Sequence, residues 1–139
     1  MKRWQLLVMT IVVVATSVWG VYRVLEGRGK KKREAAYLQD LRSYSDALKP
    51  GMSREELESY LKARGIMFKQ MCCLGQNRGV YDDLVKIGEE KPLWVCSRQM
   101  VYVRFQFNAN KQHTTSDDKT DDLDILKTVD IYRLQEGCL

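Results

Sequence analysis

MSREELESYLKARGI, residues 52–66, contains the clearest folding signal in this sequence. Ser53 and Glu56 have the spacing of a capping box. In that motif the serine hydroxyl accepts a hydrogen bond from a first-turn backbone N–H, and the glutamate carboxylate accepts one from the serine N–H. Gly65 suits the left-handed position that commonly follows a helix. The stretch therefore predicts a short helix whose buried stripe consists of Leu57, Tyr60 and Leu61.

A second helical pattern precedes this stretch, over residues 34–48. Apolar side chains recur there at three- and four-residue spacings, with charged residues between them. The pattern ends at Lys49, Pro50 and Gly51, because proline and glycine interrupt helices. The residues predicted to face the core are Leu38, Leu41, Tyr44 and Leu48.

The second half of the chain contains strand patterns. Residues 101–107 alternate between an apolar face and a polar face, which is typical of a half-buried strand. Residues 128–134 predict another strand, and residues 66–71 and 84–87 predict shorter ones. Because two helices precede these strands, we expect an α+β domain. Its two helices should pack on a small antiparallel sheet of three to four strands.

The amino-terminal segment predicts a membrane anchor. No charged residue occurs from Leu6 to Tyr22, and a run of about 17 residues is the shortest that spans a bilayer as a helix. We therefore expect a basic tail at residues 1–5, a single transmembrane helix at 6–25, a basic linker at 26–33 and the α+β domain at 34–139. A removable signal peptide is the alternative, with Ala15, Thr16 and Ser17 as small residues near a cleavage site.

Charge is concentrated around the predicted anchor. Residues 1–33 contain eight of the 23 Lys and Arg residues but only one of the 18 acidic residues, so the folded domain is close to neutral. A nucleic-acid-binding protein would carry its basic excess on the folded domain, so we expect no nucleic-acid partner. We interpret the linker as a flexible spacer that contacts anionic lipid head groups through Arg28, Lys30, Lys31, Lys32 and Arg33.

Two patterns disagree on the side of the membrane. Six basic residues follow the uncharged run Leu6–Tyr22 within residues 23–33, and such flanks tend to stay in the cytoplasm. Disulfides, by contrast, persist outside the cytoplasm. We expect a single-pass protein of the inner (cytoplasmic) membrane with an extracytoplasmic domain; a cytoplasmic domain is the alternative.

The chain contains four cysteines, which are Cys72, Cys73, Cys96 and Cys138. Structural zinc sites prefer paired ligands separated by two to four residues, and the chain has no second pair of that kind. Neighbouring Cα atoms lie ~3.8 Å apart, less than the usual spacing across a disulfide. We therefore expect Cys72 and Cys73 each to bridge to Cys96 or Cys138. Free buried thiols are the alternative, expected if the domain is cytoplasmic.

The sequence LKPGMSREELESYLKARG, residues 48–65, resembles the opening of the SmpA/OmlA-type envelope domain, a small helix–helix–sheet unit similar to half of the β-lactamase-inhibitor-like fold. The resemblance extends to about Phe68. It implies that fold and an envelope location. The chain departs from the family pattern in having no lipoprotein cysteine, no Leu-Gly-Xaa-Pro after the helix and additional cysteines.

Other residues that could take part in catalysis, recognition or metal binding have simpler interpretations. We interpret Tyr81, Asp82 and Asp83 as a solvated turn, because adjacent carboxylates on an extended chain point to opposite faces. His113 has no candidate nucleophile near it, and we expect Trp94 to pack at the edge of the core. The following residues predict a mobile acidic loop rather than a calcium site: Asp117, Asp118, Asp121, Asp122 and Asp124.

These patterns specify no catalytic constellation. We therefore expect a non-enzymatic protein-binding or assembly module of the bacterial envelope, without a cofactor or metal, that acts on a protein partner. The first alternative is a thiol-based redox protein that uses Cys72 and Cys73. The second is a membrane-tethered inhibitor of an envelope enzyme.

Overall fold

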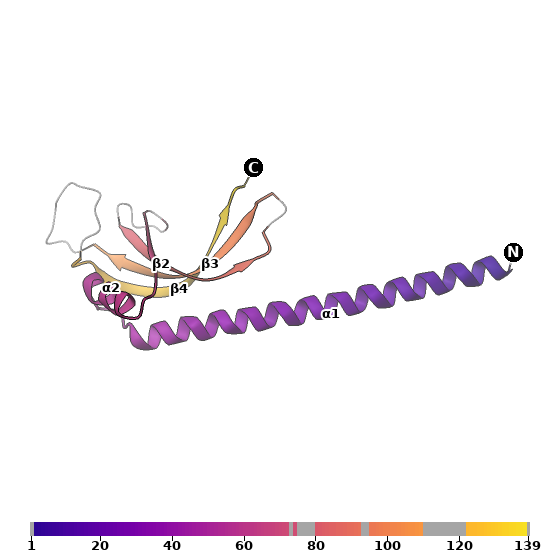
Figure 1. The fold of residues 1–139 in the computed structure, drawn as a ribbon, viewed down its shortest axis with the longest axis horizontal. Helices are drawn as coiled ribbons and strands as arrows, with labels where there is room; N and C mark the ends of the chain where they lie inside the picture. Colours follow the sequence, from indigo (N-terminus) through magenta and orange to yellow (C-terminus); the bar gives the residue numbers. More distant parts are fainter. Residues whose placement is uncertain (1, 73, 75–79, 93–94, 110–121, 139) are drawn as a thin grey trace. The chain divides into compact units, whose positions relative to one another are not determined.

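A computed structural model describes residues 2–72, 74, 80–92, 95–109 and 122–138. The chain forms two compact units, Met1–Ala36 and Tyr37–Leu139. The helices and strands, shown in Figure 1, are α1 (Lys2–Ala47), α2 (Arg54–Ala63), β1 (Lys69–Cys72), β2 (Tyr81–Glu90), β3 (Arg98–Asn108) and β4 (Ile125–Glu136). The four strands form one antiparallel sheet in the order β1-β2-β3-β4, which confirms the predicted α+β class.

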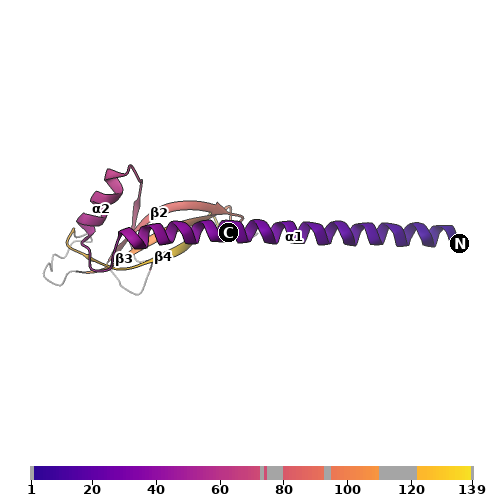
Figure 2. The ribbon, with the colours of Figure 1, turned by 90° about the horizontal axis from the view of Figure 1, so that it is seen from below.

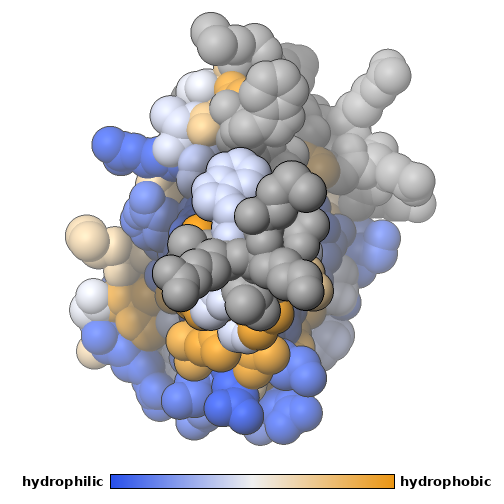
Figure 3. All heavy atoms as spheres, turned by 90° about the vertical axis from the view of Figure 1, so that its right-hand side faces the viewer, coloured by the Kyte–Doolittle hydropathy of each residue, from blue (hydrophilic) through white to orange (hydrophobic). Residues whose placement is uncertain are grey.

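The first unit consists of the amino-terminal part of helix α1. Its most apolar stretch has a mean hydropathy of 1.8 and is not buried in the chain, so α1 is long and apolar enough to cross a membrane. Figure 3 faces the amino-terminal end of α1 and shows apolar side chains in orange at this end. Within the described part of this unit, the exposed large apolar side chains include Met9, Ile11, Val13, Val18 and Trp19.

The basic linker is helical, so the expectation of a flexible spacer at residues 26–33 is wrong. Helix α1 passes through Gly27 and Gly29 without a break. Each glycine costs a helix about 1 kcal/mol relative to alanine, whereas lysine and arginine are good helix formers. The cationic run therefore continues the helix that the apolar residues begin.

In the second unit, two helical segments cover one face of the sheet. Figures 1 and 2 show α2 and the last turns of α1 on the same side of the strands. One predicted core residue of α1 is wrong: Leu38 is 42% exposed, and Tyr37 is buried instead. The core on this face consists of Leu48, Leu57, Leu61, Val85, Val103, Phe105, Phe107 and Leu126, with Leu41, Tyr44 and Tyr60 packed against it.

Helix α2 begins as its sequence predicts. The Ser53 N–H donates to Glu56 Oε2 at 3.0 Å, and the Glu56 N–H donates to Ser53 Oγ at 3.3 Å, which confirms the capping box. Gly65 has φ +66°, which confirms the left-handed residue after the helix. Leu57 and Leu61 are fully buried, so the predicted stripe faces the core.

The turn before α2 is joined to the start of β4. Gly51, at φ +98°, donates its N–H to Leu126 O at 2.9 Å, and the Leu126 N–H donates to Met52 O at 2.8 Å. The Arg54 N–H donates to Asp124 O at 2.8 Å. These bonds hold the amino-terminal end of α2 against the segment that leads into β4.

Strand β3 has two buried faces rather than one. Val103, Phe105 and Phe107 lie under the helices, as the alternation predicts. On the opposite face, Met100 and Tyr102 form a smaller apolar cluster with Leu84, although the sequence pattern indicated a polar face. Met71, Leu74, Tyr132 and Leu134 pack against this cluster from neighbouring segments.

Candidate functional site

A fully buried charged residue, Arg54, lies in the first turn of α2. Its side chain is fully buried, and Nη1 lies 2.6 Å from Asp83 Oδ1 on β2. Nη2 donates to the carbonyl oxygen of Tyr81 and lies 3.4 Å from Asp124 Oδ2. The guanidinium carbon lies 3.8 Å from the centre of the Phe107 ring, a cation–π contact. We call Arg54, Tyr81, Asp83, Phe107 and Asp124 the Arg54 network.

Asp82 and Asp83 are buried in strand β2, so the prediction of a solvated turn is wrong. Their carboxylates do point to opposite faces, because successive residues of a strand alternate. Asp83 lies on the helix side, paired with Arg54, and its strand partner Phe105 belongs to the same core. The turn interpretation failed because an arginine 29 residues away supplies the counter-charge.

The Asp83 carboxyl takes up a proton more readily than an exposed aspartate. Burial raises its pKa to about 7, against the lowering effect of the Arg54 guanidinium. Glu58 and Asp82 add like charge that also raises the pKa. Arg54 Nε and Asp83 Oδ2 are buried without a hydrogen-bond partner among the described residues. Because Asp83 is fully buried, it can exchange a proton but has no surface at which to meet a substrate.

A second ionic group lies on the other face of the sheet. Arg104 on β3 donates from Nε and Nη2 to the two carboxylate oxygens of Asp130 on β4, at 2.9 and 2.6 Å. Gln106 Nε2 donates to Asp130 at 2.8 Å, and the Arg104 guanidinium lies 4.9 Å from the Tyr132 ring centre. The hydrogen bond to Asp130 raises the pKa of Arg104. This bidentate pair joins two residues that lie opposite each other on β3 and β4.

The cysteine pairing differs from the prediction. Cys96 and Cys138 form a disulfide with each other, so neither is bridged to Cys72 or Cys73. Cys72 is also disulfide-bonded, and Cys73 lies outside the described residues. The register of β3 with β4 explains the observed bond. Arg98 is opposite Glu136, so Cys96 and Cys138, each two residues beyond this pair, are brought together.

The remaining predicted sites divide into three groups. Arg28, Lys30, Lys31, Lys32 and Arg33 are exposed on helix α1. Asp124, assigned to a mobile acidic loop, is instead buried in the Arg54 network, whereas Asp122 is exposed. Trp94, His113, Asp117, Asp118 and Asp121 lie outside the described residues.

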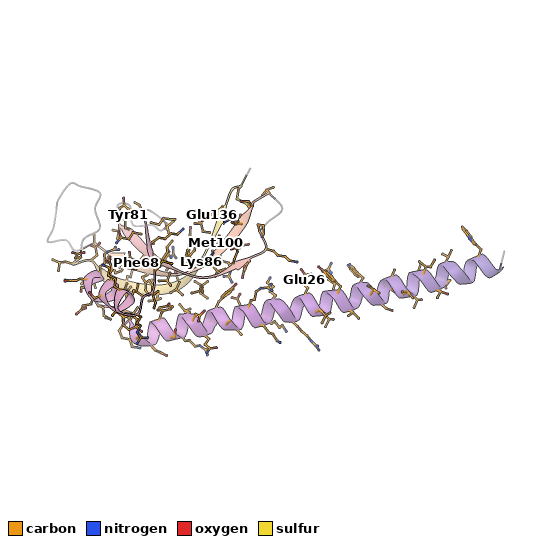
Figure 4. All side chains as sticks on the ribbon, viewed as in Figure 1. Glu26, Phe68, Tyr81, Lys86, Met100 and Glu136 are labelled. Carbon is orange, nitrogen blue, oxygen red and sulfur yellow. A yellow bond between two sulfur atoms is a disulfide. The ribbon has the colours of Figure 1, made fainter. Side chains whose placement is uncertain are left out.

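An open groove of about 490 Å³ lies beside the helix-covered face of the sheet. Its lining combines the last turns of α1, the segment before β1 and the middle of β2, which contains Lys86, labelled in Figure 4. Most of this lining is apolar, and Met67 is 90% exposed. The lining residues are Tyr44, Ile66, Met67, Val85, Lys86, Ile87 and Gly88.

Sequence reasoning missed both the Arg54 network and the groove. A signal for Arg54 was present, because residues 54, 57 and 61 share one face of a helix and two of them are core leucines. No local pattern marks the groove, since it forms from three separate segments.

Among the residues that the structure describes, no group of three or more His, Cys, Asp or Glu side chains is arranged to hold a metal ion. Comparisons with protein-family models, with curated proteins and with solved structures give no match for this chain.

Proposed function

We propose that this chain is a membrane-anchored protein of the bacterial envelope whose α+β domain is a non-enzymatic protein-binding or assembly module. The proposal rests on the presence of two features in the same chain. An apolar helix with uncovered side chains begins the chain, and the domain that follows has an open apolar groove. An unburied apolar helix needs a membrane or a partner to shield it from water.

Binding is favoured over catalysis by the way in which charged groups of the domain are paired. Arg54 and Asp83 contact each other, as do Arg104 and Asp130, and each pair joins separate elements. Arg54 and Asp83 are fully buried and cannot meet a substrate, and the charges of the partly exposed Arg104 and Asp130 are engaged with each other. The similarity of residues 48–65 to the SmpA/OmlA-type domain also supports an envelope role, since the motif forms a glycine turn and a capped helix ahead of a sheet.

We further propose that the domain lies outside the cytoplasm. The Cys96–Cys138 disulfide supports this side, because structural disulfides persist mainly in oxidising compartments. Alkaline phosphatase fused after Leu139 is expected to be active in a bacterial host, and a green fluorescent protein fused there is expected to be dim. The reverse pattern would place the domain in the cytoplasm.

A matched variant tests the anchor itself. Replacing Val12 and Val13 by lysine puts two charges in the middle of the apolar stretch, at a cost of about 2.5–3.5 kcal/mol each. We expect this chain to leave the membrane fraction after alkaline carbonate extraction, while the parent chain stays. Retention of both chains would contradict a transmembrane anchor.

The binding role is tested by cross-linking the full chain in native membranes, followed by purification. We expect one stoichiometric partner protein. Recovery of the chain alone, at several cross-linker lengths, would contradict the proposed function.

A further inference from the structure

Strand β2 is longer than β1, the edge strand that pairs with it. β1 pairs with residues 81–84 only, whereas β2 runs to Glu90 and pairs with β3 along this extension. No described segment pairs with residues 85–90 on the side away from β3. Antiparallel pairing directs backbone N–H and C=O groups to both sides of a strand, so this half of β2 offers an edge to a further strand.

The groove lies at this edge. Ile66 and Met67 lie in the segment that leads into β1 but do not continue its pairing with β2, and they line the groove together with residues 85–88. Val85 and Ile87 face the helix side, where they contact the main core. Lys86 faces the other side, because its strand partner is Tyr102, a member of the smaller cluster.

We propose that this edge binds an extended peptide segment of a partner protein, added as a strand beside residues 85–88. The segment has apolar residues next to Val85 and Ile87 and an acidic residue next to Lys86. This inference rests on the proposed function as a protein-binding module, and it names the site and the chemical class of the partner segment. Strand addition of this kind combines main-chain hydrogen bonds with pockets for alternate side chains.

The charge of the partner segment follows from Lys86. Its side chain is 51% exposed, and Nζ lies 3.5 Å from Glu89 Oε2. Exposed ion pairs of this kind contribute little to stability, so Lys86 is able to exchange Glu89 for a carboxylate on the added strand. Opposite charges directly across two strands stabilise the pairing, and like charges oppose it.

The apolar residues of the segment follow from the lining. Met67 is 90% exposed and Ile87 is half-buried, so both have apolar surface still in contact with water. Covering that surface with apolar side chains of the added strand favours binding. The flexible thioether of Met67 also adapts to side chains of different shape.

The test uses the full chain in phosphatidylcholine nanodiscs and a fluorescent heptapeptide of alternating valine and glutamate. Fluorescence anisotropy is expected to show saturable binding. Lys86→Glu is expected to weaken this binding about fivefold or more, from the loss of one opposite-charge pair and the gain of a like-charge pair. Lys127→Glu makes the same charge change at an exposed position of β4 and serves as the matched control. It should leave the binding of the peptide unchanged.

Two further peptides separate strand addition from general attraction to the basic helix. A peptide with lysine in place of glutamate is expected to prefer the Lys86→Glu chain. A valine–glutamate peptide N-methylated at every peptide bond cannot donate backbone amide hydrogen bonds and is expected to lose binding. Equal weakening by both substitutions, full binding of the N-methylated peptide, or no saturable binding of the first peptide would overturn the inference.

Cross-linking the Lys86→Glu chain in native membranes distinguishes the inference from the function on which it rests. Loss of the partner from Lys86→Glu but not from Lys127→Glu is expected. Recovery of the partner by Lys86→Glu at the level of the parent chain would overturn the groove proposal and leave the proposed function standing. If the parent chain itself recovers no partner, the proposed function fails instead. The peptide measurements still decide whether the groove binds an added strand.

Discussion

Arg54 joins three segments that are distant in the sequence. It connects the start of α2 to Asp83 on β2 and to Asp124 before β4, while its guanidinium lies against Phe107. A fully buried guanidinium is strongly unfavourable unless charge and hydrogen bonds compensate it, so the position of each partner is constrained by the others.

Replacing Arg54 by methionine is expected to lower the free energy of unfolding by about 3–5 kcal/mol at pH 8, because Asp83 is then buried without its counter-charge. Urea unfolding in detergent micelles measures the change. The double variant Arg54→Met, Asp83→Leu should recover most of the loss, since it removes both charges. Arg42→Met, on the exposed side of α1, is the control. An Arg54→Met chain as stable as that control would contradict the role assigned to the network.

Asp83 makes stability depend on pH. Its pKa is about 7 in the folded state and near 3.8 without the fold, so between these values the folded chain holds a proton that the unfolded chain releases. Raising the pH from about 4 through about 7 therefore lowers the free energy of unfolding. Asp83→Asn is expected to reduce this slope in urea titrations at pH 5 and pH 8. Asp82 remains in that variant. Burial raises its pKa, so Asp82 contributes the remaining pH dependence of stability. An unchanged slope in Asp83→Asn would show that Asp83 does not titrate in this range.

At the scale of elements, helix α1 and strand β2 meet at a glycine. A Cβ built on Gly88 would lie 2.6 Å from Tyr37 Cε1, and Gly88 follows an irregularity in the β2–β3 register. The Tyr37 ring needs this flat backbone to reach its buried position. Tyr37 is thus buried on the core face of α1, whereas Leu38 is 42% exposed.

Gly88→Ala is expected to lower the free energy of unfolding by about 1–3 kcal/mol, the usual cost of forcing an extra group into a packed site. Thermal unfolding by circular dichroism measures it. Tyr37→Leu removes the ring atoms that the new methyl group meets, so the double variant should be less destabilised than the sum of the single changes. Strict additivity of the two changes would indicate that Tyr37 and Gly88 do not contact each other.

At the scale of the whole domain, the disulfide closes one end of the sheet. Cys96 and Cys138 are separated by 42 residues and lie just outside the paired ends of β3 and β4. Ser97 reinforces this end, because its N–H donates to Glu136 O at 3.1 Å. The disulfide therefore ties the carboxyl-terminal tail to the segment before β3.

Replacing both Cys96 and Cys138 by serine is expected to lower the free energy of unfolding by roughly 3–4 kcal/mol, from the greater conformational freedom of the unfolded chain. Urea unfolding of the parent and of the double variant measures the difference. The difference in the free energy of unfolding should disappear when both chains are unfolded in reducing buffer. A difference that persists there would mean that the serines, and not the lost bond, cause the change.

Local signals in the sequence predicted a large part of the fold. The capping box at Ser53 and Glu56 gave the start of α2, and the alternation over residues 101–107 gave the centre of β3. Both depend on neighbours within a few residues, so spacing alone was sufficient. The same holds for the apolar run of α1, whose composition carries the membrane prediction.

The remaining features were decided by tertiary structure. Asp83 was assigned to a solvated turn because its partner Arg54 is 29 residues away, and only the packing of α2 on the sheet brings the two together. The pairing of Cys96 with Cys138 follows from the register of β3 and β4, which no cysteine spacing contains. The sequence by itself thus determined the capped helix α2, the apolar part of α1 and the centre of β3. Buried charges, the disulfide and the groove arise from contacts between those segments, which depend on the three-dimensional arrangement of the whole domain.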